Sequence, residues 1–144
     1  MAKYLPHGTI FSIGGDVVGG LVSVSVPDRT RGEVETTDSG SGGTRAYLPG
    51  LREGGSVKLT FRHNPQDVGQ LALEANYAAA AGAAATLETC VITLPDAATS
   101  STGSRTYTFQ GFVTEAPSGD LALIDDNAAE QSCTVKVAGA VTIA

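Results

Sequence analysis

Apolar and polar residues alternate along most of the chain, and this pattern predicts β-strands. The alternating segments are separated by stretches rich in glycine, proline and other turn-forming residues. We expect strands at residues 9–13, 21–27, 33–37, 56–63, 87–94, 105–115 and 130–138. The apolar faces expected from the alternation are Val57, Leu59 and Phe61 in one segment and Val22, Val24 and Val26 in another.

One segment between the strands has the pattern of a helix. Asn64 suits the N-cap and Pro65 suits the first helical position. The apolar positions recur at i, i+3, i+4 and i+7, which predicts one face packed on the sheet. That face consists of Val68, Leu71, Ala72 and Ala75. We expect Gly82 to end the helix.

These elements predict a mainly β fold, a small antiparallel β-sandwich or barrel with one lateral α-helix. The length of 144 residues fits a single domain, 1–144, with its own core. Cys90 and Cys133 fit neither a disulfide framework nor a Cys-x-x-Cys zinc site, so we interpret both as small core residues. No apolar stretch approaches the roughly 20 residues of a membrane span, and no signal-type segment follows Met1, so we expect synthesis in the cytoplasm.

The charge of the chain is acidic and unevenly distributed. Nine Lys and Arg residues stand against 15 Asp and Glu residues, a formal net charge of −6. Residues 73–144 hold two basic and eight acidic side chains, so the second half carries the whole excess. This balance excludes a protein that grips nucleic acid by neutralising phosphates, because that mode needs clustered Lys and Arg.

Motifs for catalysis and phosphate binding are missing from the sequence. It contains no G-x-S-x-G, no Gly-Lys-Ser/Thr phosphate loop, no G-x-G-x-x-G and no H-E-x-x-H. His7 or His63 could serve as a general base, but we favour a packing or capping role for His63. We therefore expect no enzymatic activity and no cofactor.

One acidic cluster has the oxygen ligands that a hard cation prefers. It consists of Asp120, Asp125, Asp126 and Asn127. The spacing lacks the D-x-D-x-D-G pattern of a calcium loop, so we favour a solvated acidic hairpin and expect no metal.

Two runs in the first half carry a resemblance to a known family. One extends from Val34 to Gly40 and contains Asp-Ser-Gly; the other extends from Arg45 to Phe61 and contains Leu-Pro-Gly-Leu. In order they give a polar strand, a loop, a turn and an amphipathic strand, followed by a helix after Asn64-Pro65. This order resembles the tail tube (major tail) proteins of long, non-contractile bacteriophage tails, as in siphoviruses, over about residues 8–138.

The resemblance implies a structural virion protein. Proteins of that family form hexameric rings that stack into a tube, and double-stranded DNA passes through it during ejection without specific binding. It also implies contacts with further copies and with tail tip, tape measure and terminator proteins, no membrane partner, and a place in the virion tail after assembly in the host cytoplasm. Six copies at −6 give −36 per ring, which suits a lumen that repels phosphates. The lumen candidates are Glu33, Glu35, Glu115 and Glu130.

The segment 38–51 is the candidate for ring-to-ring stacking, given the resemblance. Its glycines allow adaptation, Arg45 suits carboxylates of the next ring, and Tyr47 and Leu48 are amphipathic anchors. The alternative is a surface loop whose Tyr47 and Leu48 fold back on their own domain. The stacking candidates are Asp38, Ser39, Gly40, Arg45, Tyr47, Leu48, Pro49 and Gly50, and the first three and last three are expected to shape turns.

Three alternatives to this function remain open from the sequence. The inner tube of a contractile tail or secretion system would share the wall architecture. A receptor-binding β-sandwich on a virion surface would call for exposed aromatic residues, but Trp is absent and aromatic residues make up 6% of the chain. An enzyme has the least support.

Overall fold

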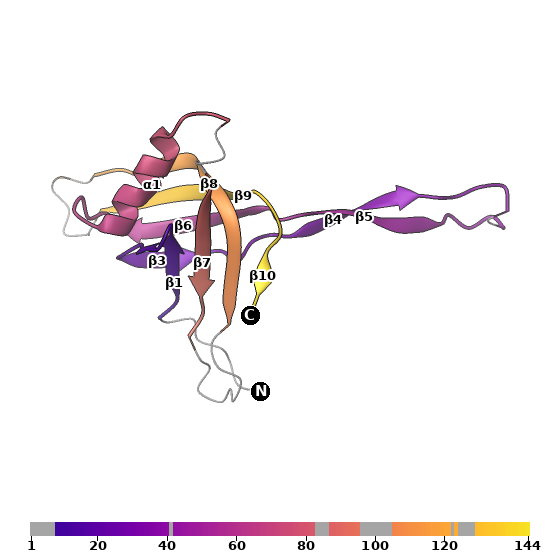
Figure 1. Cartoon of the computed structure of the whole chain (residues 1–144), viewed down its shortest axis with the longest axis horizontal. Coiled ribbons are helices and arrows are strands. Elements are labelled where there is room, and N and C mark those ends of the chain that lie inside the picture. The colour runs from indigo at the N-terminus through magenta and orange to yellow at the C-terminus, as the bar shows by residue number, and fades with distance from the viewer. Residues whose placement is uncertain (1–7, 41, 83–86, 96–104, 122, 124–128) are drawn as a thin grey trace.

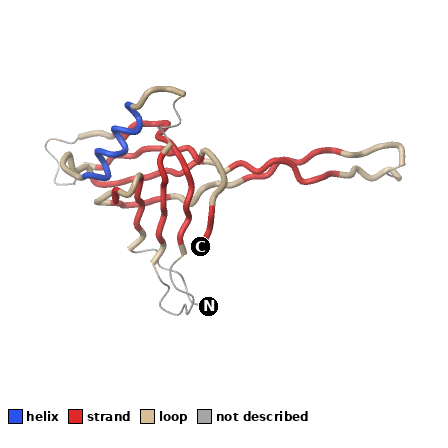
Figure 2. Tube along the Cα trace, in the orientation of Figure 1, coloured by secondary structure: helices blue, strands red, loops and turns tan. Residues whose placement is uncertain are grey.

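A computed structural model describes residues 8–40, 42–82, 87–95, 105–121, 123 and 129–144 of the chain. It contains antiparallel strands and one helix, which confirms the mainly β sandwich with a lateral helix (Figure 2). The elements are β1 (Ile10–Ile13), β2 (Asp16–Val17), β3 (Leu21–Val24), β4 (Thr30–Glu35), β5 (Tyr47–Glu53), β6 (Ser56–Arg62), α1 (Val68–Ala78), β7 (Glu88–Thr93), β8 (Thr106–Ser118), β9 (Glu130–Val137) and β10 (Thr142–Ile143).

The body of the protein is one eight-stranded sheet that folds over on itself. Its strands follow the order β2-β1-β7-β8-β9-β6-β3, with β10 paired to β8. In Figure 1, β1 and β7 run across the direction of β6 and β9, and α1 covers one end of the sandwich. The 13-residue β8 joins the two layers, and its register to β9 shifts on either side of Glu115. Such bulges bend a strand, which lets β8 belong to both layers.

The core lies between the two layers and follows the predicted alternation closely. Val57, Leu59 and Phe61 of β6 are fully buried, as the period of two predicts. Cys90 and Cys133 are free and buried, which confirms their assignment to the core. Burial raises the pKa of both thiols to about 12.

The alternation predicted for residues 21–27 is broken by a bulge. Leu21 pairs with Phe61 and Ser23 pairs with Thr60, so Val22 has no partner of its own on β6. Val22 is 49% exposed, whereas Leu21 packs against the core. The prediction that Val22, Val24 and Val26 share one face is therefore wrong, because an inserted residue reverses the facing of the residues before it.

The helix α1 is shorter than predicted and begins later. Its N-cap is Asp67, whose carboxylate accepts a hydrogen bond from Gln70 N at 3.1 Å. Asn64 instead caps the preceding turn, accepting from Gln66 N at 3.1 Å. The helix ends at Ala78, before Gly82.

The face of α1 that packs on the sheet also differs from the prediction. Val68 and Leu71 are exposed, and the buried positions are Gly69, Gln70 and Leu73. Gly69 lies against the backbone of Val17, where a Cβ atom would collide. The helix therefore packs on the sheet through Gly69, Gln70 and Leu73 and not through its more apolar stripe. The reason is that the side chain of Gln70 forms hydrogen bonds with backbone groups of the neighbouring segments.

Gln70 joins three chain segments through its side-chain amide. Nε2 donates to Gly19 O at 3.0 Å and to Arg62 O at 2.8 Å, and Oε1 accepts from Asn64 N at 2.9 Å. These backbone groups lie where β3, β6 and α1 meet and are not paired within the β-sheet, so they need hydrogen bonds from a polar side chain.

None of the described helices is long and apolar enough to cross a membrane.

Candidate functional site: a projecting hairpin arm

Strands β4 and β5 leave the body together and form a two-stranded arm (Figures 1 and 2). We use the name arm for residues 30–53. Beyond the strands, Thr36 N donates to Ala46 O at 2.8 Å, and Ala46 N donates to Thr37 Oγ1 at 2.8 Å. At the tip, Gly40 N donates to Asp38 Oδ1 at 2.9 Å, which shapes a tight turn. The arm is therefore an ordered hairpin up to its last turn.

The side chains of the arm have almost no cover from the rest of the protein. Every residue of β4 is exposed, and so is every residue of β5 apart from Gly50. Val34 and Leu48 face each other across the strands and are 54% and 58% exposed, while Leu51 is 92% exposed. Because an isolated two-stranded hairpin is marginally stable in water, this surface calls for a partner.

The structure places the predicted stacking residues along this arm. Asp38, Ser39, Gly40 and Arg45 lie at the tip, and Tyr47, Leu48, Pro49 and Gly50 lie in β5. Tyr47 and Leu48 are exposed and do not fold back on their own domain. The tip turn at Asp38 is confirmed.

The predicted turn at Leu48-Pro49-Gly50 is wrong, because these residues belong to a strand. The register moves from Arg31–Arg52 to Glu33–Pro49, so β5 carries one extra residue as a bulge. Gly50 permits it: a Cβ atom there would lie 3.0 Å from the carbonyl of Gly32. Pro49, which has no N–H to donate, is tolerated on a strand at the edge of a sheet.

The four lumen candidates fall on two separate parts of the fold. Glu33 and Glu35 lie in β4 on the arm. Glu115 lies at the bulge of β8, and its Oε2 accepts a hydrogen bond from Thr134 Oγ1 at 3.3 Å. Glu130 begins β9, with its Oε1 3.9 Å from Arg62 Nη1. The structure does not gather these carboxylates on one element.

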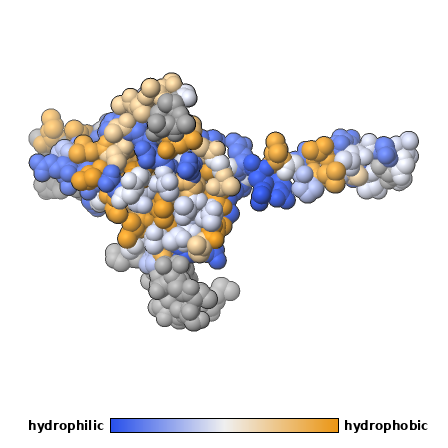
Figure 3. Space-filling model, viewed as in Figure 1, coloured by the Kyte–Doolittle hydropathy of each residue, from blue (hydrophilic) through white to orange (hydrophobic). Residues whose placement is uncertain are grey.

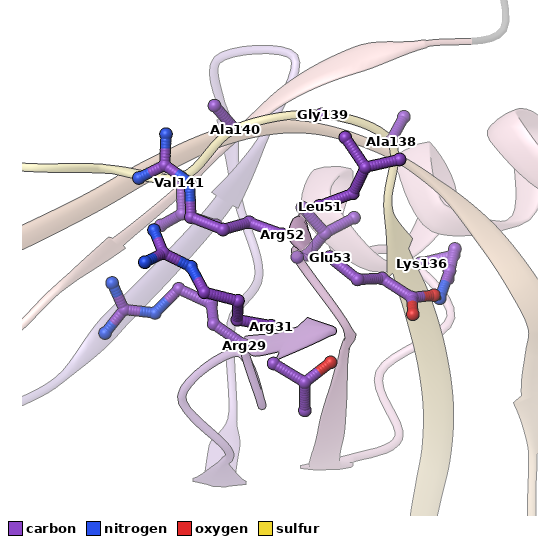
Figure 4. Close-up of a pocket in the computed structure, with 13 residues that line it drawn as sticks. Arg29, Arg31, Leu51, Arg52, Glu53, Lys136, Ala138, Gly139, Ala140 and Val141 are labelled. Atoms are coloured by element: carbon purple, nitrogen blue, oxygen red, sulfur yellow. The ribbon is translucent and has the colours of Figure 1, made fainter. Parts of the chain in front are cut away.

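A cationic pocket lies at the base of the arm (Figure 4). It has a volume of about 700 Å³, and the loop from β9 to β10 forms its other wall. Its charged lining is Arg29, Arg31, Arg52, Glu53 and Lys136. Figure 3 shows a hydrophilic stretch where the arm leaves the body and hydrophobic side chains farther along it. The local sequence pattern does not predict this pocket, because Arg31 and Arg52 come together only through the pairing of β4 with β5.

The direction of the arm is fixed by contacts at its base. Ser56 N donates to Asp28 Oδ1 at 2.7 Å, and this bond is the main cause that lowers the pKa of Asp28. Gly54 leaves no room for a Cβ atom beside the side chain of Val137, and Gly55 has a φ of +76°. The hydrogen bond to Asp28 and the close packing of Gly54 on Val137 therefore hold the base of the arm against the sheet.

The remaining chemical candidates do not form a site within the described residues. His63 directly follows β6, and its backbone N–H donates to Ala129 O at 2.8 Å. Its buried Nδ1 has no hydrogen-bond partner among the described residues. No group of three or more His, Cys, Asp or Glu residues in the described part of the chain could hold a metal ion. Asp120 is exposed, whereas His7, Asp125, Asp126 and Asn127 lie outside the described residues.

Comparison with solved structures finds the same fold in tail and injection machines. A chain of the PVC extracellular contractile injection system, from a structure of its sheath/tube terminator in the extended state, is 17% identical with a TM-score of 0.76, over 100% of this chain and 98% of that one. A chain from the tube-terminating cap of the anti-feeding prophage is 18% identical with a TM-score of 0.76, over 100% and 92%. A chain of the native gene transfer agent virion is 16% identical with a TM-score of 0.67, over 99% of each chain.

Sequence comparison adds nothing to these structural matches. No protein-family model matches the chain, and no curated protein is significantly similar to it in sequence. At identities of 16–18%, the structural likeness establishes the fold. The chain therefore has the tail tube-like fold that these injection-system and virion chains share.

Proposed function

We propose that this protein is a structural subunit of a tail-type tube, in which hexameric rings stack on one another. The assemblies in which chains of this fold occur support the proposal. They are a sheath–tube complex, a baseplate with sixfold symmetry, and a gene transfer agent tail with C6 symmetry. In such a particle the subunit sits in the tail. Its partners are further copies, together with the tip, tape measure and terminator proteins of the tail.

The projecting arm is the observation that carries this proposal. It is the part of the fold that lacks a core of its own, since both of its strands are exposed along their length. Its apolar pair of Val34 and Leu48 would be covered by a neighbouring copy. A contact between an arm and a different surface is heterologous, and contacts of that kind build rings or open stacks.

The sheet of the body supplies the wall of the proposed tube. With strands about 4.8 Å apart and tilted about 40°, a closed wall of roughly 24 strands has a bore near 38 Å between side chains. Six copies giving four strands each meet this count, and a duplex of about 20 Å passes freely. We keep Glu115 and Glu130 as lumen candidates because they lie on the sheet, and we assign Glu33 and Glu35 to contacts between copies because they lie on the arm.

The tail type has two candidates. The long, non-contractile tail is the one that the sequence resemblance implies. The inner tube of a contractile system is favoured by the structural matches, since chains from contractile injection systems reach TM-scores of 0.68–0.76, against 0.57–0.67 for those of the gene transfer agent. Micrographs of native particles separate the two, because a sheath surrounds the tube only in a contractile tail.

Negative-stain electron microscopy of the purified protein tests the proposal. We expect sixfold rings or hollow tubes once the concentration exceeds a threshold. Rings that never stack would instead indicate a tube terminator or cap, the kind of structure in which two of the matched chains occur. Compact monomers at all concentrations, with no ring in any micrograph, would overturn the proposal.

A further inference from the structure

The pocket at the base of the arm has more basic than acidic side chains in its lining, so it carries a net positive charge. Four basic side chains and one acidic side chain line it. The acidic one, Glu53, is already engaged, because its Oε1 accepts from Lys136 Nζ at 3.0 Å. In Figure 4 the three arginine side chains extend to the opposite side of the pocket from that ion pair. Within the described residues, none of these arginines forms an ion pair.

Two of these arginines are held next to each other by the strand register. Arg31 and Arg52 are directly opposite each other on β4 and β5. Like charges at such positions destabilise a hairpin, so the arrangement favours binding of an anion. Arg29 is the third, and its guanidinium lies 6.0 Å from the ring of Tyr107, which leaves its hydrogen-bond donors free to reach a ligand.

The same face of the arm carries negative charge farther out. Alternation along β4 puts Arg31, Glu33 and Glu35 on one face, and Val34 with its partner Leu48 on the other. The charged face is therefore positive at its base and negative in its middle. About 13 Å separates residues 31 and 35 along an extended strand of this length. The basic base of one arm is therefore complementary in charge to the acidic middle of another arm.

We propose that the arm-base pocket binds the carboxylates of Glu33 and Glu35 from the arm of a second copy. This inference rests on the proposed function, in which the arm of each copy contacts a neighbouring copy. Arginine forks bind carboxylates in a bidentate manner, which fixes register as well as partner. The pocket of one copy and the carboxylates of the next are different parts of the surface, so the contact is heterologous, and a heterologous contact can repeat from copy to copy and close a ring.

The occupant follows from charge and from continuity of the surface. The chain carries a net charge of −6, so a second copy offers carboxylates in excess. Leu51 also lines the pocket and is 92% exposed, so a neighbour that enters the pocket covers an apolar side chain as well. A contact of this kind depends on ionic strength, since salt screens charges that are partly exposed to solvent.

Charge reversal in three variants tests the proposal. Arg31→Glu with Arg52→Glu reverses the pocket, Glu33→Arg with Glu35→Arg reverses the middle of the arm, and the third variant carries all four changes. We expect each double variant to raise the critical concentration for assembly about tenfold or more, because like charges then face each other. The fourfold variant restores complementarity and should return to within about threefold of the unchanged protein.

A matched control shows whether the effect belongs to the arm. Lys58→Glu with Arg105→Glu makes the same change in net charge as Arg31→Glu with Arg52→Glu, but on exposed positions of the body. It should assemble like the unchanged protein, and circular dichroism should show all variants folded. Double variants that assemble normally, or a fourfold variant no better than either double, would overturn the proposal.

Cysteine cross-linking tests the contact without requiring tubes. Arg52→Cys and Glu35→Cys variants with tags of different mass are mixed and oxidised, and we expect a disulfide-linked heterodimer. The two native cysteines stay silent because both are buried. Lys58→Cys mixed with Glu35→Cys is the control and should not cross-link.

The two readouts separate this inference from the proposed function. Tubes without the cross-link would reject the arm-to-pocket contact and leave the tube proposal standing. The cross-link without rings or tubes would support the contact and reject the tube proposal. Absence of both would reject both.

Discussion

Replacing Gln70 with alanine should destabilise the protein strongly, although the residue is polar. The side chain is 5% exposed and serves three backbone groups, the carbonyls of Gly19 and Arg62 and the N–H of Asn64. Each buried group left without a partner costs about 1–3 kcal/mol. These groups are partly buried, so water can reach some of them, and we take the low end of the range. The sum predicts a loss of about 3 kcal/mol in the free energy of unfolding.

Urea denaturation followed by circular dichroism measures this loss. Gln70→Ala should lower the midpoint with little change in the slope m, because the fold and its buried area stay the same. In a thermal melt the loss corresponds to roughly 6–12 °C for a domain of this size. Gln66→Ala is the matched control: Gln66 is the same residue type on the exposed side of the preceding turn and should change stability by less than about 0.5 kcal/mol.

The result that would refute this reasoning is a loss below about 1 kcal/mol for Gln70→Ala. It would mean that water satisfies the two carbonyls as well as the amide does. Gln70→Glu adds a further check, because a carboxylate can still accept from Asn64 N but cannot donate to the carbonyls. It should therefore be at least as damaging as alanine at pH 7.

Three further predictions concern the arm and the core. Tyr47→Ala with Leu48→Ser should give a folded monomer, by circular dichroism, that forms no tubes in electron micrographs, because the anchors of the arm are lost; normal tubes would contradict a role in stacking. Asp28→Asn should reduce thermal stability at neutral pH: the lowered pKa of Asp28 means that its contribution is present above the unfolded pKa and disappears as pH falls through the folded pKa, so melts of the two proteins should converge in acid. The native thiols should react with a thiol reagent only on unfolding, since burial raises their pKa to about 12; fast reaction of the folded protein would be inconsistent with that burial.

The sequence predicts the strands of the body well, because one of their faces is buried. Val57, Leu59 and Phe61 alternate with polar residues, and the core accepts them as expected. The period of two is visible wherever a strand separates core from solvent. The fold class therefore follows from local pattern alone.

The helix face could not be predicted in the same way. Its apolar stripe of Val68 and Leu71 is genuine, but the packing is decided by Gln70, whose partners come from segments distant in sequence. The bulge at Val22 is also a tertiary effect, set by its pairing with β6. The local pattern of apolar and polar residues does not show which backbone groups of distant segments will need a hydrogen bond.

Only part of the arm could be predicted from the sequence. Because both faces of β4 and β5 are exposed, neither strand alternates, and the glycines and proline of β5 read as turns. The exposure of Tyr47 and Leu48 agrees with the expected contact surface. The basic pocket cannot be predicted from the sequence, because the pairing of Arg31 with Arg52 depends on the register of the hairpin.

The continuity of β5 and β6 has a mechanical consequence for a subunit whose arm is held by a neighbour. β5 ends at Glu53 and β6 begins at Ser56, so one nearly uninterrupted ribbon runs from the arm into the middle of the body (Figure 1). Hydrogen bonds between antiparallel strands lie across the strand direction, and β6 is bonded to β9 on one side and to β3 on the other. Tension applied along the arm would therefore load many of these hydrogen bonds at the same time, in shear. It would not break them one after another. The arm is thus built as a tether, and the strand at its root, β6, is anchored in the core by Val57, Leu59 and Phe61.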